Sequence, residues 1–479
     1  MPADPAISDD MLFATVRALG KALRQGQITS VALTEAYLDR LEKIGPRLGA
    51  VVTVTRALAL RQARRADQEL QAGKSRGPLH GIPYGVKDLA ATQGIPTTWG
   101  AAPYRQQVFD YDAAVVEKLQ DAGAVLVAKL AMVELAGGFG YNNADASFTG
   151  PGRTPWNVKF WSGGSSSGSG AAVAAGLVPF AIGTETSGSI ITPSAFCGVS
   201  GLRPTFGRVS RFGVMALSWT LDKIGPMCRT ADDCGLVLAA LAGPDPRDET
   251  TLPVPFSHTE AAAAPNKKWR IGVIKGATES AMPEVRRNFE AALNVLAKVA
   301  EINADVALPD LPFSSAISLI VRAEAASAFR DLLDSGKAAA LRNANDRWGG
   351  YTGALVLAID YLQALRSRGP MRQALAEAYA GYDALVAPSL PTVAYPIGQD
   401  FDQAYPDYRG AGPPIIQAGN IAGQPALSVP NGFGANGLPT GIQFTGKIGD
   451  EATLIALAHA YQQATDWHQR RPKIGEQGP

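Results

Sequence analysis

The first part of the chain has the apolar periodicity of helices. From about residue 11 to residue 54, apolar side chains recur at intervals of three and four residues. Ser30 stands where an N-cap is expected, and Gly45-Pro46 marks the end of that helix. The pattern predicts an N-terminal helical layer over residues 1–75.

Short apolar runs alternate with helical segments after residue 76. Residues 85–87 have the composition of a strand end, and residues 124–129 form a run typical of a buried strand. Between them, Asp112 is placed to cap a helix that stops at Gly123. This alternation predicts an α/β fold.

A loop-rich stretch over residues 243–268 is our candidate boundary between two parts of the molecule. After it, Trp269–Ile274 predicts a strand and Pro283 opens an amphipathic helix. The helical pattern continues to about residue 382, so residues 269–385 form a mostly helical region.

The last part of the chain, residues 386–479, combines Pro- and Gly-containing turns, short apolar strands and a helix over Ala452–Ala464. We expect it to rejoin the sheet. The chain then forms one large domain in five parts, with residues 76–242 as its core.

Composition narrows the class of protein. Apolar residues make up 46% of the chain and charged residues 18%, as in ordinary globular proteins. The 44 Lys and Arg against 43 Asp and Glu leave a charge of +1, which excludes a bulk field that would hold nucleic acid. The longest run of small apolar residues, Ala171–Gly183, is shorter than the roughly 20 residues of a membrane span.

Three cysteines are too few for a disulfide scaffold, and no C-x-x-C or H-E-x-x-H pattern suggests zinc. The acidic N-terminus lacks the apolar segment of a signal peptide. We therefore expect a cytoplasmic protein without a metal.

Small residues dominate two neighbouring segments, Ser162–Gly170 and Thr184–Ile190. Such segments let backbone N–H groups approach a ligand closely, as in a phosphate loop, an oxyanion hole or a linker. A helix-like run follows the first segment at once, which argues against a linker. No Gly-Lys-Ser/Thr or G-x-G-x-x-G pattern is present, which argues against a nucleotide site.

A nucleophilic serine is the remaining interpretation. Ser166 matches the G-x-S-x-G elbow, but residues 156–161 before it are not convincingly a strand. A triad also needs a histidine, and those that follow stand where surface or packing roles are more common: His258, His459 and His468. Lys87 is an alternative base, because burial lowers a lysine pKa. A salt bridge with Asp88 would be its ordinary structural role.

Three motifs occur together in one order: Gly81-Ile-Pro-Tyr-Gly-Val-Lys-Asp88, Gly163-Gly-Ser-Ser-Ser-Gly-Ser169 and a third over residues 188–204, with Asp222-Lys-Ile-Gly-Pro226 downstream. In these motifs and their order, the sequence resembles the amidase signature family. The resemblance implies a mixed central β-sheet between α-helical layers, a catalytic core over residues 76–242, and no metal or organic cofactor.

The resemblance also assigns catalytic roles. It implies that Ser189 is the nucleophile, that Ser165 is a bridging serine after a cis Gly164-Ser165 peptide, and that Lys87 is the neutral base. It implies an oxyanion hole made of the backbone N–H groups of Thr186, Ser187, Gly188 and Ser189. A binding protein with a dead site is disfavoured, because all three catalytic residues are retained.

Two departures from the family pattern bear on the substrate. Ser187 replaces a glycine, and Ile191 replaces an arginine that would bind a carboxylate. We therefore expect a neutral small-molecule substrate: an amide first, then an aryl amide, carbamate (urethane) or ester. The alternative is the glutamine-hydrolysing subunit of an amidotransferase. Ile191 disfavours it, and so does the Leu130-Ala131 pair, which stands where the family has Thr-Asn.

Several residues near the motifs are candidates for substrate binding: Met132, Gly138, Phe139, Tyr141, Ile191 and Trp219. The helical stretch over residues 317–364 is our candidate for a cover that sets specificity. The sequence is compatible with a homodimer and does not decide the oligomeric state.

Overall fold

The computed structural model describes residues 7–141, 143–258, 268–408 and 412–474. Eleven strands lie in these residues: β1 (Val51–Val54), β2 (Pro83–Lys87), β3 (Val125–Leu130), β4 (Phe180–Glu185), β5 (Ser200–Arg203), β6 (Lys223–Cys228), β7 (Trp269–Ile274), β8 (Ala300–Val306), β9 (Ala384–Pro388), β10 (Ala426–Phe433) and β11 (Pro439–Thr445). They form one sheet in the order β1-β3-β2-β4-β6-β5-β10-β11-β9-β7-β8. The runs β3-β2-β4 and β9-β7-β8 are parallel and the other neighbours are antiparallel.

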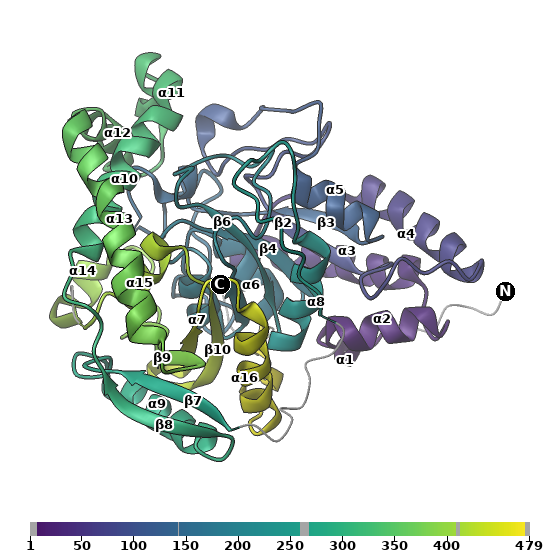
Figure 1. Ribbon diagram of the computed structural model, residues 1–479. Coiled ribbons are helices and arrows are strands. Elements are labelled where there is room, and N and C mark those ends of the chain that lie inside the picture. Colours follow the sequence, from purple (N-terminus) through teal and green to yellow (C-terminus); the bar gives the residue numbers. More distant parts are fainter. Residues whose placement is uncertain (1–6, 142, 259–267, 409–411, 475–479) are drawn as a thin grey trace.

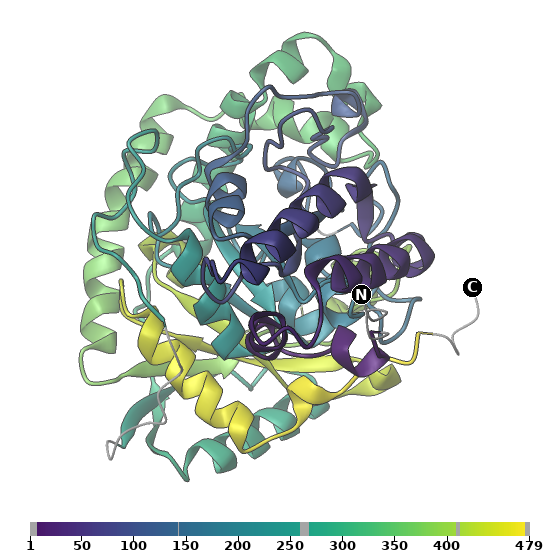
Figure 2. The same ribbon diagram turned by 90° about the vertical axis from the view of Figure 1, so that its right-hand side faces the viewer.

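Sixteen α-helices in the described residues surround the sheet (Figures 1 and 2). The first eight are α1 (Asp9–Leu12), α2 (Val16–Arg24), α3 (Ser30–Leu48), α4 (Arg56–Gln71), α5 (Ala114–Asp121), α6 (Ser167–Ala174), α7 (Ile191–Cys197) and α8 (Ala231–Leu241). The others are α9 (Pro283–Leu296), α10 (Phe313–Ala328), α11 (Arg330–Asp334), α12 (Asp346–Gly353), α13 (Ala358–Tyr379), α14 (Phe401–Ala404), α15 (Ile415–Ala422) and α16 (Glu451–Gln463).

The sheet is covered on both faces, which confirms the expected mixed sheet between helical layers. In β4, Phe180 and Ile182 join the core that contains α8 and α16, whereas Ala181 joins the core that contains α6. The parallel strands β2 and β4 are neighbours, so Lys87 and Thr184 lie near the carboxyl ends of adjacent strands. In open α/β sheets this edge is the usual place for a ligand site.

The N-terminal layer is helical only as far as Leu48. The prediction of helix up to residue 54 is wrong for Val51–Val54, which form β1 and pair antiparallel with β3. Gly49, with φ at 56°, ends α3 in the left-handed conformation. The run Val-Val-Thr-Val that follows is rich in β-branched residues, which favour a strand.

Two boundaries of α3 also differ from the prediction. Thr29, not Ser30, is the cap, because the Thr29 side chain accepts a backbone N–H of the first turn at 3.1 Å. The helix passes Gly45-Pro46 without stopping. A proline in the last turn removes only one hydrogen bond near the helix end, so the helix tolerates it.

Two further predictions fail for local reasons. Asp112 does not cap α5, which Ala113 precedes; its carboxylate instead accepts a hydrogen bond from Gln93 N at 2.7 Å. Residues 300–306, where continued helix was predicted, form β8. This strand lies at the edge of the sheet and its side chains are mostly exposed or half-buried, so it lacks the apolar run of a central strand.

The other elements agree with the sequence pattern. The strands predicted at 124–129 and 269–274 are β3 and β7, Pro283 opens α9, and the predicted C-terminal helix is α16. The last part of the chain does rejoin the sheet, because β10 and β11 lie between β5 and β9. Residues 259–267 of the loop-rich connection lie outside the described residues, and strands from both sides of it share the one sheet.

The close approach of α6 to the sheet requires glycine at position 168. A Cβ on Gly168 would lie 2.4 Å from Ala50 O and 2.5 Å from Ala131 N. These are backbone atoms of segments that are hydrogen-bonded to each other, Ala131 N donating to Ala50 O at 2.9 Å, so they have little freedom to move.

We predict that Gly168→Ala lowers the free energy of unfolding by about 1–3 kcal/mol, as overpacking usually does. Gly369→Ala is the matched control, because Gly369 also lies in a helix but has no atom within 4 Å of the place a Cβ would take. The control should be neutral or stabilising by up to ~1 kcal/mol. Urea unfolding of both variants measures this; equal stabilities would contradict the packing account.

Candidate active site

Lys87 lies in the centre of the site and is fully buried. Its Nζ donates to Ser165 Oγ at 2.7 Å and to Thr184 Oγ1 at 2.8 Å. Burial lowers the pKa of Lys87 to about 7, although the nearby carboxylates of Asp222 and Glu185 act to raise it. A substantial fraction of Lys87 is therefore neutral near pH 7, as a general base must be.

The serine-rich loop before α6 presents Ser165 to this lysine. The Gly164-Ser165 peptide is cis, as the resemblance implied. Tyr141 donates a hydrogen bond from its hydroxyl to Gly164 O. Burial raises the pKa of Tyr141, and contacts with the Thr192 and Ser189 hydroxyls act against that rise. Tyr141 therefore joins the Ser165 loop to the predicted nucleophile.

Ser189 lies in the loop between β4 and α7 and is 3% exposed. Its carbonyl accepts a hydrogen bond from Ser166 N at 3.3 Å, which ties this loop to the one that carries Ser165. Ser166 itself is occupied: its Oγ donates to Thr184 O and accepts from Thr184 N, both at 3.2 Å. The elbow interpretation for Ser166 is also weakened because residues 156–161 form turns and isolated bridges, not a strand.

The backbone around Ser189 is arranged by Glu185. One oxygen of this carboxylate accepts from Ile190 N at 2.9 Å and Ile191 N at 3.0 Å. The other accepts from Arg203 and Asn420, at 2.8 and 2.7 Å. Glu185 thus occupies the two N–H groups that follow Ser189.

The N–H groups of the preceding residues stay available. Within the described part of the chain, Ser187 N, Gly188 N and Ser189 N have no hydrogen-bond acceptor. Gly188 has φ at 104°, a conformation that favours glycine. These groups and Thr186 N form the predicted oxyanion hole, a role that stays a prediction.

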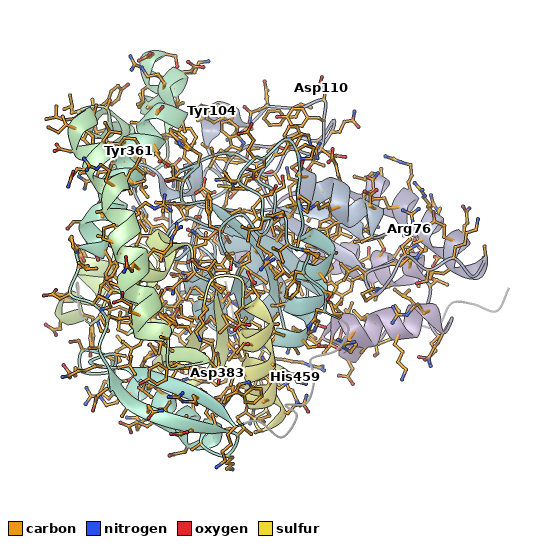
Figure 3. All side chains as sticks on the ribbon, in the orientation of Figure 1. Arg76, Tyr104, Asp110, Tyr361, Asp383 and His459 are labelled. Atoms are coloured by element: carbon orange, nitrogen blue, oxygen red, sulfur yellow. The ribbon has the colours of Figure 1, made fainter. Side chains whose placement is uncertain are left out.

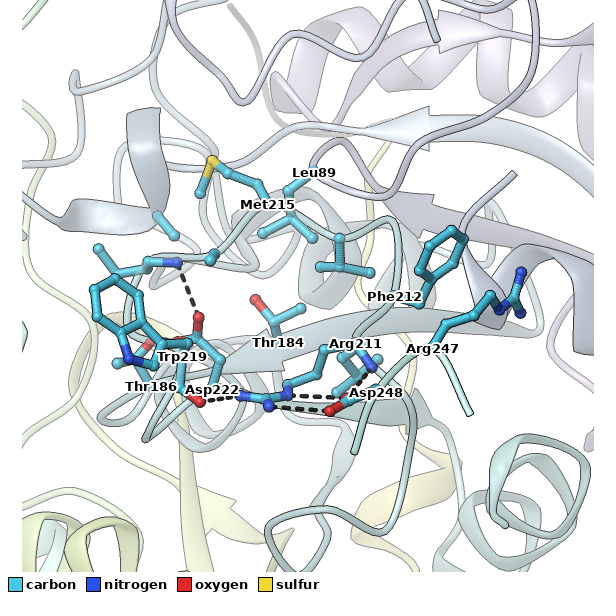
Figure 4. A pocket seen from close by; sticks show the side chains of 15 residues that line it. Leu89, Thr184, Thr186, Arg211, Phe212, Met215, Trp219, Asp222, Arg247 and Asp248 are labelled. Carbon is cyan, nitrogen blue, oxygen red and sulfur yellow. Dashed lines mark hydrogen bonds and ion pairs between the residues drawn. The ribbon is translucent and has the colours of Figure 1, made fainter. Parts of the chain in front are cut away.

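A pocket of about 220 Å³ opens beside these residues (Figure 4). Its walls are largely apolar; the apolar residues are Leu89, Ala136, Phe212, Val214, Met215, Ala216, Leu217, Trp219 and Ile224. The polar and charged lining residues are Thr184, Thr186, Arg211, Asp222, Arg247 and Asp248. Two of these charged residues, Arg211 and Asp248, are paired with each other at 3.2 Å. Ser165 and Ser189 are not among its lining residues.

The six predicted substrate-binding residues lie in different surroundings. Trp219 lines the pocket and is 41% exposed. Gly138 lies directly behind the pocket wall, because a Cβ there would meet Leu217 at 2.4 Å. Phe139 packs edge-on against another ring, while Met132 and Ile191 are fully buried. Of the six, only Trp219 lines this pocket, and Tyr141 contacts the serine loops.

Sequence reasoning missed several residues of the site. Thr184 is the second hydrogen-bond partner of Lys87, and its signal was its place next to Glu185 in the Thr-Glu-Thr-Ser-Gly-Ser run. Leu217 and Met215 line the pocket, but an apolar residue in a loop carries no signal of that role.

The helical region supports the pocket wall from outside. Glu324 of α10 accepts hydrogen bonds from Ser218 Oγ at 2.5 Å and Thr220 Oγ1 at 2.8 Å. Tyr361 of α13, labelled in Figure 3, also donates to Glu324. These contacts place the predicted cover, residues 317–364, against the pocket segment.

The histidines make their contacts elsewhere in the fold. His258 pairs with Asp232 at 2.8 Å, and His459 lies on α16, at the lower side of the molecule in Figure 3. Burial and Arg229 lower the pKa of His468 to about 4. His258 therefore has a carboxylate partner outside the site, and the surface or packing roles of the three histidines stay predictions.

Metal-binding clusters and membrane-spanning helices are both absent from the described residues. No group of three or more His, Cys, Asp or Glu side chains there could hold a metal ion. Likewise, no described helix has the length and apolar character needed to cross a membrane.

Comparison with known proteins identifies the family. The sequence matches the Amidase family over residues 32–455, so the chain belongs to the amidase signature family. The A subunit of glutamyl-tRNA(Gln) amidotransferase from Thermosynechococcus vestitus is 37% identical, over 96% of this chain and 100% of that protein. Native peptide amidase from Stenotrophomonas maltophilia has a TM-score of 0.85 and 31% identity, over 96% and 99% of the two chains. The A subunit of the Thermotoga maritima amidotransferase has a TM-score of 0.78 and 27% identity, over 96% of each chain.

If Lys87 is the base, we predict that kcat/KM rises with pH through an apparent pKa of about 7. The sign follows because only neutral Lys87 accepts a proton, so activity is lost below that pKa. A pH–rate profile on any hydrolysed amide measures this. A rate that is flat between pH 5 and 9, with chemistry rate-limiting, would contradict the assignment.

Replacing the base tests the same assignment. Lys87→Met should lower kcat by roughly 10²–10⁴-fold, the usual size of general-base catalysis. Lys129→Gln is the matched control, because Lys129 is equally buried but is paired with Asp88 at 3.1 Å. That control should keep the acid limb of the wild-type profile even if it lowers stability.

Proposed function

We propose that this protein hydrolyses the carbon–nitrogen bond of a small carboxamide through an acyl-enzyme on Ser189. The observation that carries the proposal is the Lys87–Ser165 contact of 2.7 Å, made by a lysine whose pKa is lowered to about 7. A buried lysine bonded to a serine hydroxyl is suited to take a proton from it.

The catalytic cycle then has two halves. In the first, Ser189 Oγ attacks the carbonyl carbon while its proton passes through Ser165 to Lys87, and the oxyanion binds the N–H groups of residues 186–189. Collapse of this tetrahedral intermediate breaks the C–N bond, and the amine leaves with the proton that Ser165 returns from Lys87. In the second half, water attacks the acyl group and the same proton route restores Ser189.

The preferred substrate is a neutral amide. The pocket walls are largely apolar. Position 191, where the family pattern has an arginine, holds the fully buried Ile191, whose backbone N–H is bound to Glu185. No guanidinium is therefore present at that position to bind a carboxylate. Aryl amides, carbamates (urethanes) and esters follow, because one acyl-enzyme scheme serves all of them. This describes a hydrolase for carbon–nitrogen bonds other than peptide bonds.

A second candidate is a glutamine-hydrolysing subunit of an amidotransferase, which would need partner subunits. The curated relatives support this candidate better than they support the small-amide hydrolase. The 37% identity with the Thermosynechococcus vestitus protein extends over the full length of that protein. Both candidates use the same acyl-enzyme on Ser189. They differ in whether the site accepts the charged groups of glutamine.

We predict that Ser189→Ala lowers kcat by about 10⁴-fold or more on every substrate, because the nucleophile is lost. Ser169→Ala is the matched control: Ser169 is a buried serine near the start of α6 whose Oγ donates to Ile182 O at 3.1 Å, its one side-chain hydrogen bond within the described residues. Initial rates with a chromogenic anilide, carbamate and ester that share one acyl group measure both. Near-normal turnover by Ser189→Ala would contradict the proposal.

The same panel separates the two candidates. We expect kcat/KM for the neutral anilide to exceed that for L-glutamine at least about tenfold, since one unpaired charge in an apolar pocket is costly. Ammonia release from L-glutamine is the measurement for the second arm. Activity on L-glutamine alone would favour the amidotransferase candidate and direct the search to co-purifying chains.

A further inference from the structure

One carboxylate, that of Asp222, joins two segments of the active site. Asp222 Oδ1 accepts a hydrogen bond from Thr186 Oγ1 at 2.6 Å. Asp222 Oδ2 accepts from Leu217 N at 2.8 Å and Ser218 N at 2.9 Å. Thr186 belongs to the predicted oxyanion loop and Leu217 to the pocket wall, so a single side chain fixes the position of one segment relative to the other.

The three hydrogen-bond donors around Asp222 favour its ionised form. An ionised carboxylate only accepts hydrogen bonds, and each of its three contacts comes from a hydroxyl or an N–H group. Hydrogen bonds to a charged acceptor are roughly twice as strong as neutral ones. Burial acts in the opposite direction and raises the pKa of Asp222.

The charge of Asp222 is less compensated than that of Glu185, the other carboxylate that acts on Lys87. Glu185 forms a fully buried ion pair with Arg203 at 2.8 Å. The basic side chain beside Asp222 is Lys223, whose Nζ donates to Leu221 O. Burial lowers the pKa of Lys223 well below its ordinary value, which favours the neutral form of this amine.

We propose that Asp222 is a positioning residue of this site: its carboxylate holds the Thr186 loop against the pocket wall and supplies the negative charge that Lys87 faces. The inference rests on the proposed function, in which Lys87 gains a proton during acylation. Asp222 then stabilises the lysinium, while its bond to Thr186 keeps the oxyanion N–H groups aimed at the carbonyl oxygen. Asp222 itself transfers no proton.

The first test is a direct titration of Lys87. NMR of protein labelled with ¹³Cε-lysine follows the pKa of Lys87, with Lys87→Met to assign the signal. Asp222→Asn removes the charge but keeps an acceptor, and should lower the Lys87 pKa by about 0.5–1 unit, because the opposite charge that favours the ammonium is gone. The acid limb of the pH–rate profile should move to lower pH by the same amount.

Asp233→Asn is the matched control for this titration. Asp233 of α8 is another buried aspartate with two backbone donors, Val16 N at 3.0 Å and Arg17 N at 3.1 Å, and it is not among the carboxylates that act on Lys87. It should leave the Lys87 pKa unchanged. A Lys87 pKa that is equal or higher in Asp222→Asn than in the wild type would overturn the proposal.

A second pair of variants tests the link to the oxyanion loop, and serves if Asp222→Asn does not fold. Thr186→Val removes the hydroxyl that Asp222 accepts and should lower kcat at least tenfold, with a smaller change in KM and none in the Lys87 pKa. Thr186→Ser keeps the hydroxyl and should restore wild-type kcat. Equal kcat values for the two variants would overturn the positioning role.

The titration needs no substrate. A wild-type protein that fails to hydrolyse any compound of the panel would contradict the proposed function, whereas the shift of the Lys87 pKa would still decide the role of Asp222.

Discussion

The burial of the Lys87 amine is the constraint on which the rest of the site depends. In water this amine has a pKa near 10.4 and is a cation, so it cannot accept a proton at neutral pH. At the end of β2 its hydrogen-bond partners are the hydroxyls of Ser165 and Thr184, which satisfy the amine without a charge. Placing those two partners together requires the parallel pairing of β2 and β4 and the close packing of α6 at Gly168.

The loop that carries Ser189, the predicted nucleophile, depends on parts of the chain that are far apart in sequence. Glu185 arranges this loop; Arg203 of β5 neutralises its charge and Asn420 of α15 donates a hydrogen bond to it. Asn420 comes from the last part of the chain, which rejoins the sheet beside β5. The C-terminal part therefore completes the hydrogen bonding of Glu185, and residues 76–242, the predicted catalytic core, do not hold the loop alone.

Much of this architecture could be predicted because its signals are local. The apolar run of β3, the proline that opens α9 and the three motifs around Lys87, Ser165 and Ser189 are each visible in a few consecutive residues. The parts that failed lack such a signal. The edge strand β8 buries too little to show a strand pattern, and Asp112 has the composition of a cap but bonds to a residue nineteen positions earlier.

The catalytic motifs of the site could be predicted from the sequence, but the shape of its pocket could not. The motifs predicted the contact between Lys87 and Ser165, and they identified the loop that carries Ser189. It did not reveal the pocket, because Met215, Leu217 and Ile224 line it through the path of the backbone, and their apolar side chains are as common in any core. Thr184 and Asp222 act through hydrogen bonds that only the three-dimensional arrangement defines.

The central claim is that Ser189, activated through Ser165 and Lys87, carries the acyl group. The most direct measurement is peptide mass spectrometry of the protein after reaction with a fluorophosphonate, whose phosphorus is attacked by an activated serine with loss of fluoride and stays bonded to that serine. The account predicts one adduct, on Ser189, formed faster as the pH rises through about 7. An adduct on Ser165 or Ser166, or labelling that persists in Ser189→Ala, would contradict it.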